Sequence, residues 1–208
     1  MRQGLFGLTW PRPGVVLEIL VGSGVGVVSI LLLFPRHARQ TFRLQARDAA
    51  GEAAALLGLV LEGEPANAAE ISRRHTDLKR RLDTLGQAAK NVIDLPGPQR
   101  ETADRAALVR AFWRVRSDIV ILGRGFQVED AGPRLRPWKT AGERAVTRLE
   151  ALSVGRPGEP LGQPDVALAL GPAEDAGDIA RGAAAIGLAH MFRDLDDLGE
   201  RFVDLHLA

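Results

Sequence analysis

The chain has 208 residues, of which 46% are hydrophobic and 25% are charged, and its formal net charge is +1. The length allows one domain or two, and the charged fraction is that of an ordinary globular protein. The lack of Cys excludes a disulfide scaffold, a Cys-ligated zinc or iron–sulfur site and a cysteine nucleophile. A charge so close to zero argues against a general nucleic-acid binder, so no nucleic-acid partner is expected.

Residues 15–34 form a run of 20 residues with a single charge, Glu18, near its start. A helix of that length spans ~30 Å, the thickness of the hydrocarbon core of a bilayer. Trp10 before the run and Pro35 after it are typical of a membrane interface and of a helix end. We therefore predict an N-terminal flank over residues 1–14 and a transmembrane helix over 15–34. A buried core helix and a cleaved signal peptide are the alternatives.

Basic residues follow the apolar run. Four arginines and no acidic residue lie between residues 35 and 47, whereas residues 1–14 hold two arginines and the terminal amine. Because cytoplasmic flanks of membrane helices are enriched in Lys and Arg, we predict a single-pass protein of the inner membrane with residues 35–208 in the cytoplasm. The lipid bilayer is then a partner, with anionic headgroups near the arginines. The residues expected at the membrane interface are Trp10, Arg36, Arg39 and Arg43.

Small residues mark one face of the predicted span. Gly22 and Gly26 lie four residues apart, and Ser29 lies seven residues after Gly22, so the three share a face that lets another helix approach closely. This predicts packing against other transmembrane helices, by self-association or in a missing transporter subunit; alternatively, Gly is simply common in such helices. Glu18 is a candidate functional carboxylate inside the membrane, or it reaches the headgroup region from the first turns of the helix.

Beyond the span the sequence predicts an all-α fold, an antiparallel helical bundle. In the last helix of this bundle, residues 174–205, Ile186 is predicted to lie on the buried side. Residues 155–173, rich in Gly and Pro, are predicted to form a mobile linker. Apolar residues that recur at three, four and seven positions, with Pro/Gly breaks between the segments, predict helices over residues 36–62, 66–95, 100–123, 139–154 and 174–205.

The sequence contains no pattern that predicts an enzyme, a cofactor or a metal site. The four His form no His-Glu-x-x-His pair, and no glycine-rich loop precedes a Lys-Ser or Lys-Thr. His190 and Asp194 lie four residues apart, which indicates a salt bridge or a solvated pair. We interpret the acidic run from Asp194 to Glu200 and the basic residues from Arg73 to Arg81 as solvated helix faces. An anion or lipid site is the alternative for the basic residues.

Residues 19–57 read ILVGSGVGVVSILLLFPRHARQTFRLQARDAAGEAAALL, which is a small-residue stretch, an aliphatic run, Phe34-Pro35 and a basic segment that enters a long helix. This order resembles the end of the membrane unit of the fusaric acid resistance and aromatic acid exporter family. Residues 190–205 resemble the closing leucine-spaced helix of its cytoplasmic part. The resemblance implies a part of an efflux transporter for aromatic carboxylic acids.

The chain departs from that family because it has one predicted span. One helix cannot enclose a path through the bilayer while hiding its polar lining from lipid. The first functional hypothesis is therefore a membrane-anchored part of such a transporter that does not transport alone. The second is a single-span, membrane-anchored helical interaction domain without transport activity. The third is a soluble helical protein with residues 15–34 in its core.

Overall fold

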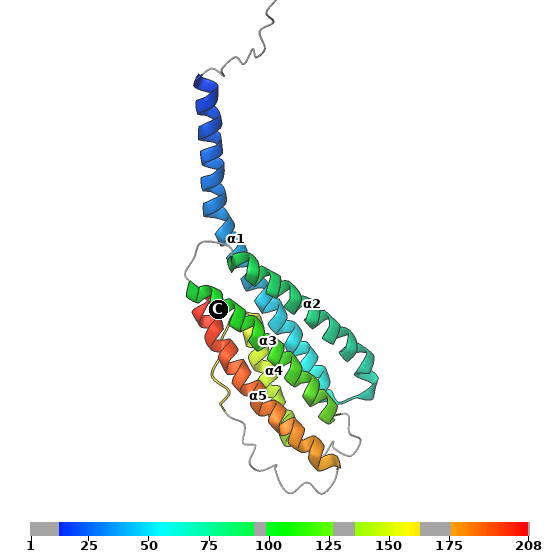
Figure 1. Ribbon diagram of the computed structural model, residues 1–208. Coiled ribbons are helices and arrows are strands. Elements are labelled where there is room, and N and C mark those ends of the chain that lie inside the picture. Colours follow the sequence, from blue (N-terminus) through cyan, green and yellow to red (C-terminus); the bar gives the residue numbers. More distant parts are fainter. Residues whose placement is uncertain (1–12, 94–98, 127–135, 163–175, 208) are drawn as a thin grey trace, which may run out of the picture.

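The computed structural model of the protein describes residues 13–93, 99–126, 136–162 and 176–207; for residues 13–20, 24–36 and several helix ends it describes the backbone only. These residues form helices and no strand, so the predicted all-α fold and helical bundle are confirmed (Figure 1). The helices are α1 (Pro13–Glu62), the short 3-10 helix η1 (Pro65–Asn67), α2 (Ala68–Ile93), α3 (Gln99–Phe126), α4 (Arg136–Ser153) and α5 (Ala176–Asp204).

Helix α1 is a single helix of 50 residues that continues through Pro35. The sequence predicted two helices here, the first ending at Pro35, and that boundary is wrong. A proline inside a helix removes one backbone hydrogen bond, whereas the Leu residues before it and the Ala/Leu-rich segment after it favour a helix on both sides. At ~1.5 Å per residue α1 is ~75 Å long. Figure 1 shows that its N-terminal part projects beyond the bundle.

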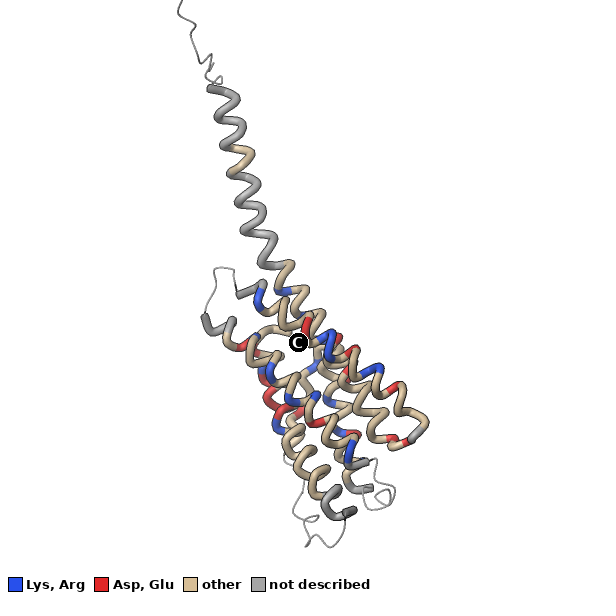
Figure 2. The backbone as a smooth tube through the Cα atoms, turned by 45° about the vertical axis from the view of Figure 1, so that its right-hand side comes forward, with Lys and Arg blue, Asp and Glu red and all other residues tan. Residues whose placement is uncertain are grey.

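The C-terminal half of α1 forms one side of the bundle core. It packs against α2 and α4, while α3 packs against α5 (Figure 1, Figure 2). The rings of Phe112 and Phe202 join α3 to α5 edge to face, with centroids 6.3 Å apart. Small side chains on α1 let its neighbours approach closely. The buried alanines of α1 are Ala46, Ala49, Ala50, Ala53 and Ala54.

Helices α4 and α5 run in the same direction, which departs from the predicted antiparallel bundle. Near the start of α4, Gly142 lies against Leu61 at the end of α1. Just after α4, Gly155 lies against Arg47, and Arg47 bonds to Leu207 just after α5. The ends of α4 and α5 therefore meet beside the same turn of α1 (Figure 1). The long connection between them allows this arrangement, because short loops join antiparallel neighbours.

The segment that follows α4 lies against α4 and α5. The backbone N–H groups of Leu161 and Gly162 donate to the two carboxylate oxygens of Asp196, at 2.8 and 3.3 Å. Arg144 of α4 donates to the carbonyl of Leu161 at 2.7 Å. Specific hydrogen bonds therefore hold the first part of the segment that the sequence predicts to be a mobile linker. The rest of that segment lies outside the described residues.

The buried side of α5 differs from the prediction at Ile186, which is 52% exposed. Ala184 and Ala185 are buried in its place, and a Cβ on Gly187 would lie only 3.5 Å from Ile121 of α3. These small residues bring α3 close to α5, so the larger side chain of Ile186 points away from the core. Farther along α5 the predicted buried residues are confirmed, and they are Met191, Leu195, Leu198 and Phe202.

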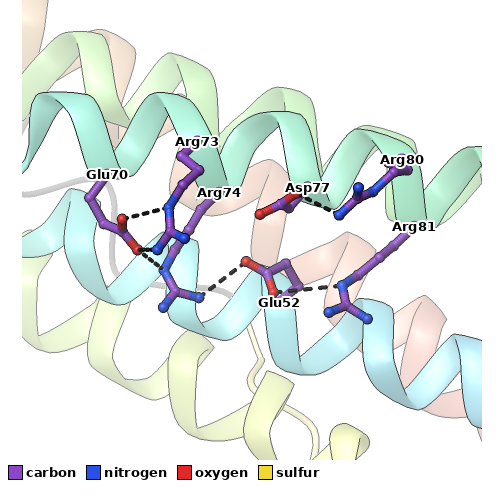
Figure 3. A network of polar contacts seen from close by, with 7 residues as sticks. All are labelled: Glu52, Glu70, Arg73, Arg74, Asp77, Arg80 and Arg81. Atoms are coloured by element: carbon purple, nitrogen blue, oxygen red, sulfur yellow. Dashed lines mark hydrogen bonds and ion pairs between the residues drawn. The ribbon is translucent and has the colours of Figure 1, made fainter.

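Charged side chains join α1 to α2 (Figure 3). Glu52 of α1, whose side chain is 13% exposed, accepts a hydrogen bond from Arg74 at 3.1 Å and lies 3.6 Å from Arg81. Glu70 binds Arg73 and Arg74 along α2 itself. The predicted solvated basic face is therefore only partly solvated. Arg73 faces water, whereas Arg74 and Arg81 reach across to α1 and fix the packing of the two helices.

Replacing Glu52 by Gln should lower the free energy of unfolding by roughly 1–3 kcal/mol, because two arginines lose a shared, mostly buried counter-charge. Asp77→Asn is the matched control. Asp77 binds Arg80 at 2.8 Å within α2, where both side chains are more exposed, so its loss should cost under about 0.5 kcal/mol. Urea unfolding followed by circular dichroism measures both, and equal losses would contradict the assigned role of Glu52.

The Leu195→Ala variant should lose roughly 2–5 kcal/mol of stability, because it leaves a cavity in the core. Ile186→Ala removes an aliphatic side chain from the same helix and should change the stability by less than about 0.5 kcal/mol. The midpoints of thermal unfolding report the difference. A large loss in Ile186→Ala would show that this face of α5 is covered in solution.

Candidate functional site

A cavity of ≈ 600 Å³ lies at the end of the bundle from which α1 projects. Residues 39–47 of α1, Arg105 of α3 and the chain end over residues 204–207 line it. Figure 1 shows the end of α5 near the turn of α1 that leaves the bundle. Among the described residues four arginines and one aspartate line the cavity, so this predominantly basic cavity is the candidate functional site. Its charged and titratable lining residues are Arg39, Arg43, Arg47, Arg105, Asp204 and His206.

The three arginines of α1 that line the cavity follow one another at intervals of four positions, so they lie on one face of the helix. Like charges at this spacing repel one another. Burial lowers the pKa of Arg47 from its ordinary value, and the charge of the neighbouring Arg43 lowers the pKa further. The face therefore concentrates basic side chains at this end of the bundle.

Arg47 also holds the end of the chain in place. Its Nε and Nη2 donate to the carbonyl oxygen of Leu207 at 3.1 and 2.8 Å. Leu207 is buried, and His206 before it has a φ of 53°, in the left-handed region. Gly155 has a φ of 75°, and a Cβ there would collide with the Arg47 guanidinium, so the position favours glycine. Arg47 is thus part of the wall of the cavity.

Arg105 adds a buried positive charge to the same cavity. The residue is 6% exposed, and its Cζ lies 5.9 Å from the centroid of the Phe42 ring. The face of an aromatic ring attracts a guanidinium group and supports it sterically. A buried charge acts more strongly on a nearby ion than an exposed one, because the surrounding medium is less polar. Arg105 therefore adds a buried basic group to the lining of the cavity.

A second cavity, of ≈ 320 Å³, is lined by residues of α3 and α5. The carboxyl groups of Asp118 and Asp194 line it, and both residues are buried. Burial raises the pKa of Asp118 to about 7; the charge of Asp194 adds to the rise, while Arg193 and Arg114 oppose it. Arg114 donates to Asp194 at 2.9 Å and to Asp197 at 3.1 Å. Asp118 therefore gains or loses its proton near neutral pH.

These contacts correct the prediction for the acidic run of α5. Asp194 is buried rather than solvated, and its ion-pair partner is Arg114 rather than His190. His190 is exposed and lines the same cavity. Asp196 is also not simply solvated, because it accepts hydrogen bonds from the segment after α4. Within the part of the chain that the structure describes, no group of three His, Cys, Asp or Glu side chains could hold a metal ion.

The structure brings two of the predicted membrane-interface residues, Arg39 and Arg43, into the basic cavity. Gly22 lies on the projecting part of α1, where a Cβ would meet no atom within 4 Å apart from its own stretch of helix, and Val21 beside it is 58% exposed. The other predicted site residues have side chains outside the described set, and they are Trp10, Glu18, Gly26, Ser29 and Arg36.

Among the residues whose side chains are described, no helix is long and apolar enough to cross a membrane. Most of the predicted span over residues 15–34 lies outside that set. The spanning of the bilayer by α1 therefore stays a prediction.

Sequence reasoning missed Arg105, Asp118 and His206. A signal existed for the first two, because both fall within the apolar three- and four-residue spacing of α3. Arg105 stands three residues before the buried Leu108, and Asp118 stands three after the buried Val115. A charged residue within a buried stripe is a candidate for a special role. Nothing local marks His206, whose place depends on the docking of the chain end onto α1.

Comparison of the chain with protein-family models, with curated proteins and with solved structures finds no match in any of the three. The functional assignment therefore depends on the residues and their geometry.

Asp118→Asn should remove a pH-dependent loss of stability. Folding raises the pKa of Asp118, so the native state favours its protonated form. The resulting contribution to the free energy of unfolding is complete below about pH 4 and is lost as the pH rises through 7. Asn is neutral throughout, so the variant should gain up to roughly 4 kcal/mol over the wild type at about pH 8 and little at about pH 4.

The exposed Asp83 on α2 provides the control. Asp83→Asn removes the same charge from the surface, so it controls for the change in net charge. Urea unfolding at several pH values measures both variants. A wild-type stability that does not fall over this range would contradict the raised pKa.

Proposed function

We propose that the protein is the membrane-anchored part of an efflux transporter for aromatic or other organic acids, of the fusaric acid resistance and aromatic acid exporter type. In this proposal residues 15–34 cross the inner membrane once, and the bundle lies in the cytoplasm. The chain does not transport alone, because one helix cannot enclose a path for a polar solute. The order of residues 19–57 supports the family, and the geometry of α1 supports the anchoring.

The continuity of α1 carries this proposal. The apolar run and the alanine-rich face that packs in the core belong to one unbroken helix, so the projecting part is rigidly joined to the bundle. Gly22 stands on the projecting part with open space around it. A small residue at such a position lets a second helix approach the backbone closely. Gly26 and Ser29 share that face by their spacing, so other spans would pack along it.

A different observation favours the second candidate, a single-span interaction domain without transport activity. One buried core includes residues from α1, α2, α3, α4 and α5 among the described residues. The bundle therefore closes its core without help from another chain. Such a domain would be anchored by the same segment but would need no further membrane spans.

Replacing Gly22 by Leu tests the transporter proposal. The larger side chain should keep the other spans at a distance and raise the accumulation of labelled benzoate in cells of the source organism toward that of a deletion strain. Val21→Leu is the matched control, because Val21 is already a bulky, exposed neighbour, and it should export like the wild type.

Two outcomes separate the hypotheses. A deletion strain that exports benzoate and related aromatic acids as fast as the wild type would overturn the transport role and leave the interaction domain. Release of the full chain from membranes by alkaline carbonate would overturn the anchoring, which both hypotheses require.

A further inference from the structure

The guanidinium group of Arg148 on α4 is buried and lacks hydrogen-bond acceptors. Arg148 is 6% exposed, and its Nε and Nη1 have no hydrogen-bond partner among the described residues. Burial lowers the pKa of Arg148, and the charge of Asp196 opposes this effect only in part. Both carboxylate oxygens of Asp196 accept instead from the N–H groups of Leu161 and Gly162. Because an arginine side chain keeps its charge in a protein, a further acceptor beside this buried cation would be strongly favourable.

A cavity of ≈ 430 Å³ lies beside this group, and residues of α4 and of the segment after α4 line it, Arg148 among them. Gly158 of that segment also lines the cavity, and a Cβ on Gly158 would lie 2.7 Å from Nη1 of Arg148. The φ of Gly158 is 65°, so the position favours glycine, and its backbone lies against Nη1 at the cavity wall. A Cβ on Gly199 of α5 would collide with the same guanidinium group. A small shift of Gly158 therefore opens Nη1 to a ligand in the cavity.

We infer that this cavity binds a small organic monocarboxylate, with Arg148 as the residue that pairs with the carboxylate group. A guanidinium group is planar and holds its N–H donors in directions that match carboxylate oxygens. A charge-assisted hydrogen bond in buried surroundings is stronger than one in water, because the local medium is less polar. The site lies in the bundle, so the inference goes beyond the proposed membrane role and does not depend on it.

The rest of the lining indicates the kind of carboxylate. Ala151, Pro160 and Leu161 add apolar surface to the cavity, which suits a short aliphatic body. Glu143 and Glu159 also line the cavity and are exposed, so their charges disfavour a doubly charged phosphate more than a singly charged carboxylate. The volume of ≈ 430 Å³ equals that of about fourteen water molecules at roughly 30 Å³ each, which is enough for an acid of about five carbons.

The test is a calorimetric titration of the full chain, purified in a neutral detergent, near neutral pH. The probes are pentanoate, its neutral amide pentanamide and inorganic phosphate, each with a blank titration into detergent alone. We expect pentanoate to bind with a Kd of about 1 mM or below and the other two probes to bind at least about tenfold more weakly. Pentanamide has nearly the same shape without the charge, so it isolates the ion pair with Arg148.

Arg148→Met should weaken the binding of pentanoate by at least about tenfold, because the ion pair is lost. The substitution removes a buried charge that lacks acceptors, so the variant should keep its fold, which circular dichroism checks. Glu159→Gln removes a nearby negative charge at an exposed position and should tighten the binding by about threefold. Arg156→Gln is the matched control, because Arg156 is an exposed arginine of the same segment outside the cavity lining. It should leave the affinity unchanged.

No heat of binding from pentanoate up to about 10 mM would overturn the site. Equal affinity for pentanamide would overturn the pairing with Arg148, and equal or tighter binding of phosphate would overturn the assignment of a carboxylate. An equal loss in Arg156→Gln would show nonspecific charge attraction and overturn the site. If Arg148→Met fails to fold, Glu159→Gln still decides, because an unchanged affinity in that variant would place the ligand elsewhere. None of these results bears on the anchoring, which carbonate extraction reads separately.

Discussion

The packing of the alanine-rich half of α1 against α2 and α4 positions every other feature of the molecule. Because the buried alanines leave little side-chain volume between the helices, the neighbours contact α1 closely along several turns. The same helix continues without a break into the projecting part. The direction of the apolar segment, the placement of the arginines and the shape of the basic cavity are therefore set by one contact surface.

The two cavities use charge in opposite ways. At the base of α1, arginines from two helices line a cavity together with Asp204, and the segment after α5 closes the wall through Arg47. Between α3 and α5, two carboxylates lie together and only one of them, Asp194, is bonded to Arg114. The first arrangement collects basic side chains beside Asp204, whereas the second holds a proton on Asp118 near neutral pH.

Local periodicity was enough to predict the helical class and most of the buried positions. The recurrence of apolar residues correctly marked Leu78, Leu82 and Leu85 on α2, because each helix face repeats within a few residues. It failed at Ile186, where the nearby Ala and Gly residues decided which face α3 could approach. The expectation that Pro35 ends a helix was wrong for another reason, because one lost hydrogen bond did not outweigh the helix-forming residues on either side.

The candidate site was only half visible in the sequence. The sequence marked Arg39 and Arg43 as membrane-interface residues, but the other residues of the cavity come from α3 and from the segment after α5. Asp194 and Arg114 are separated by 80 positions in the sequence, and no local pattern joins residues so far apart. The parallel run of α4 and α5 likewise depends on a connection whose path the sequence does not specify.

The depth of α1 in a bilayer tests the central claim most directly. The chain has no Cys, so single substitutions Val21→Cys and Leu44→Cys allow one nitroxide label each on the full chain in lipid nanodiscs. Relaxation by oxygen, which concentrates in lipid, and by a water-soluble nickel complex then gives the depth of each label. We predict that the label at position 21 relaxes mainly with oxygen and that the label at position 44 relaxes with nickel near the membrane surface. Equal access of nickel to both labels would contradict a membrane-anchored α1.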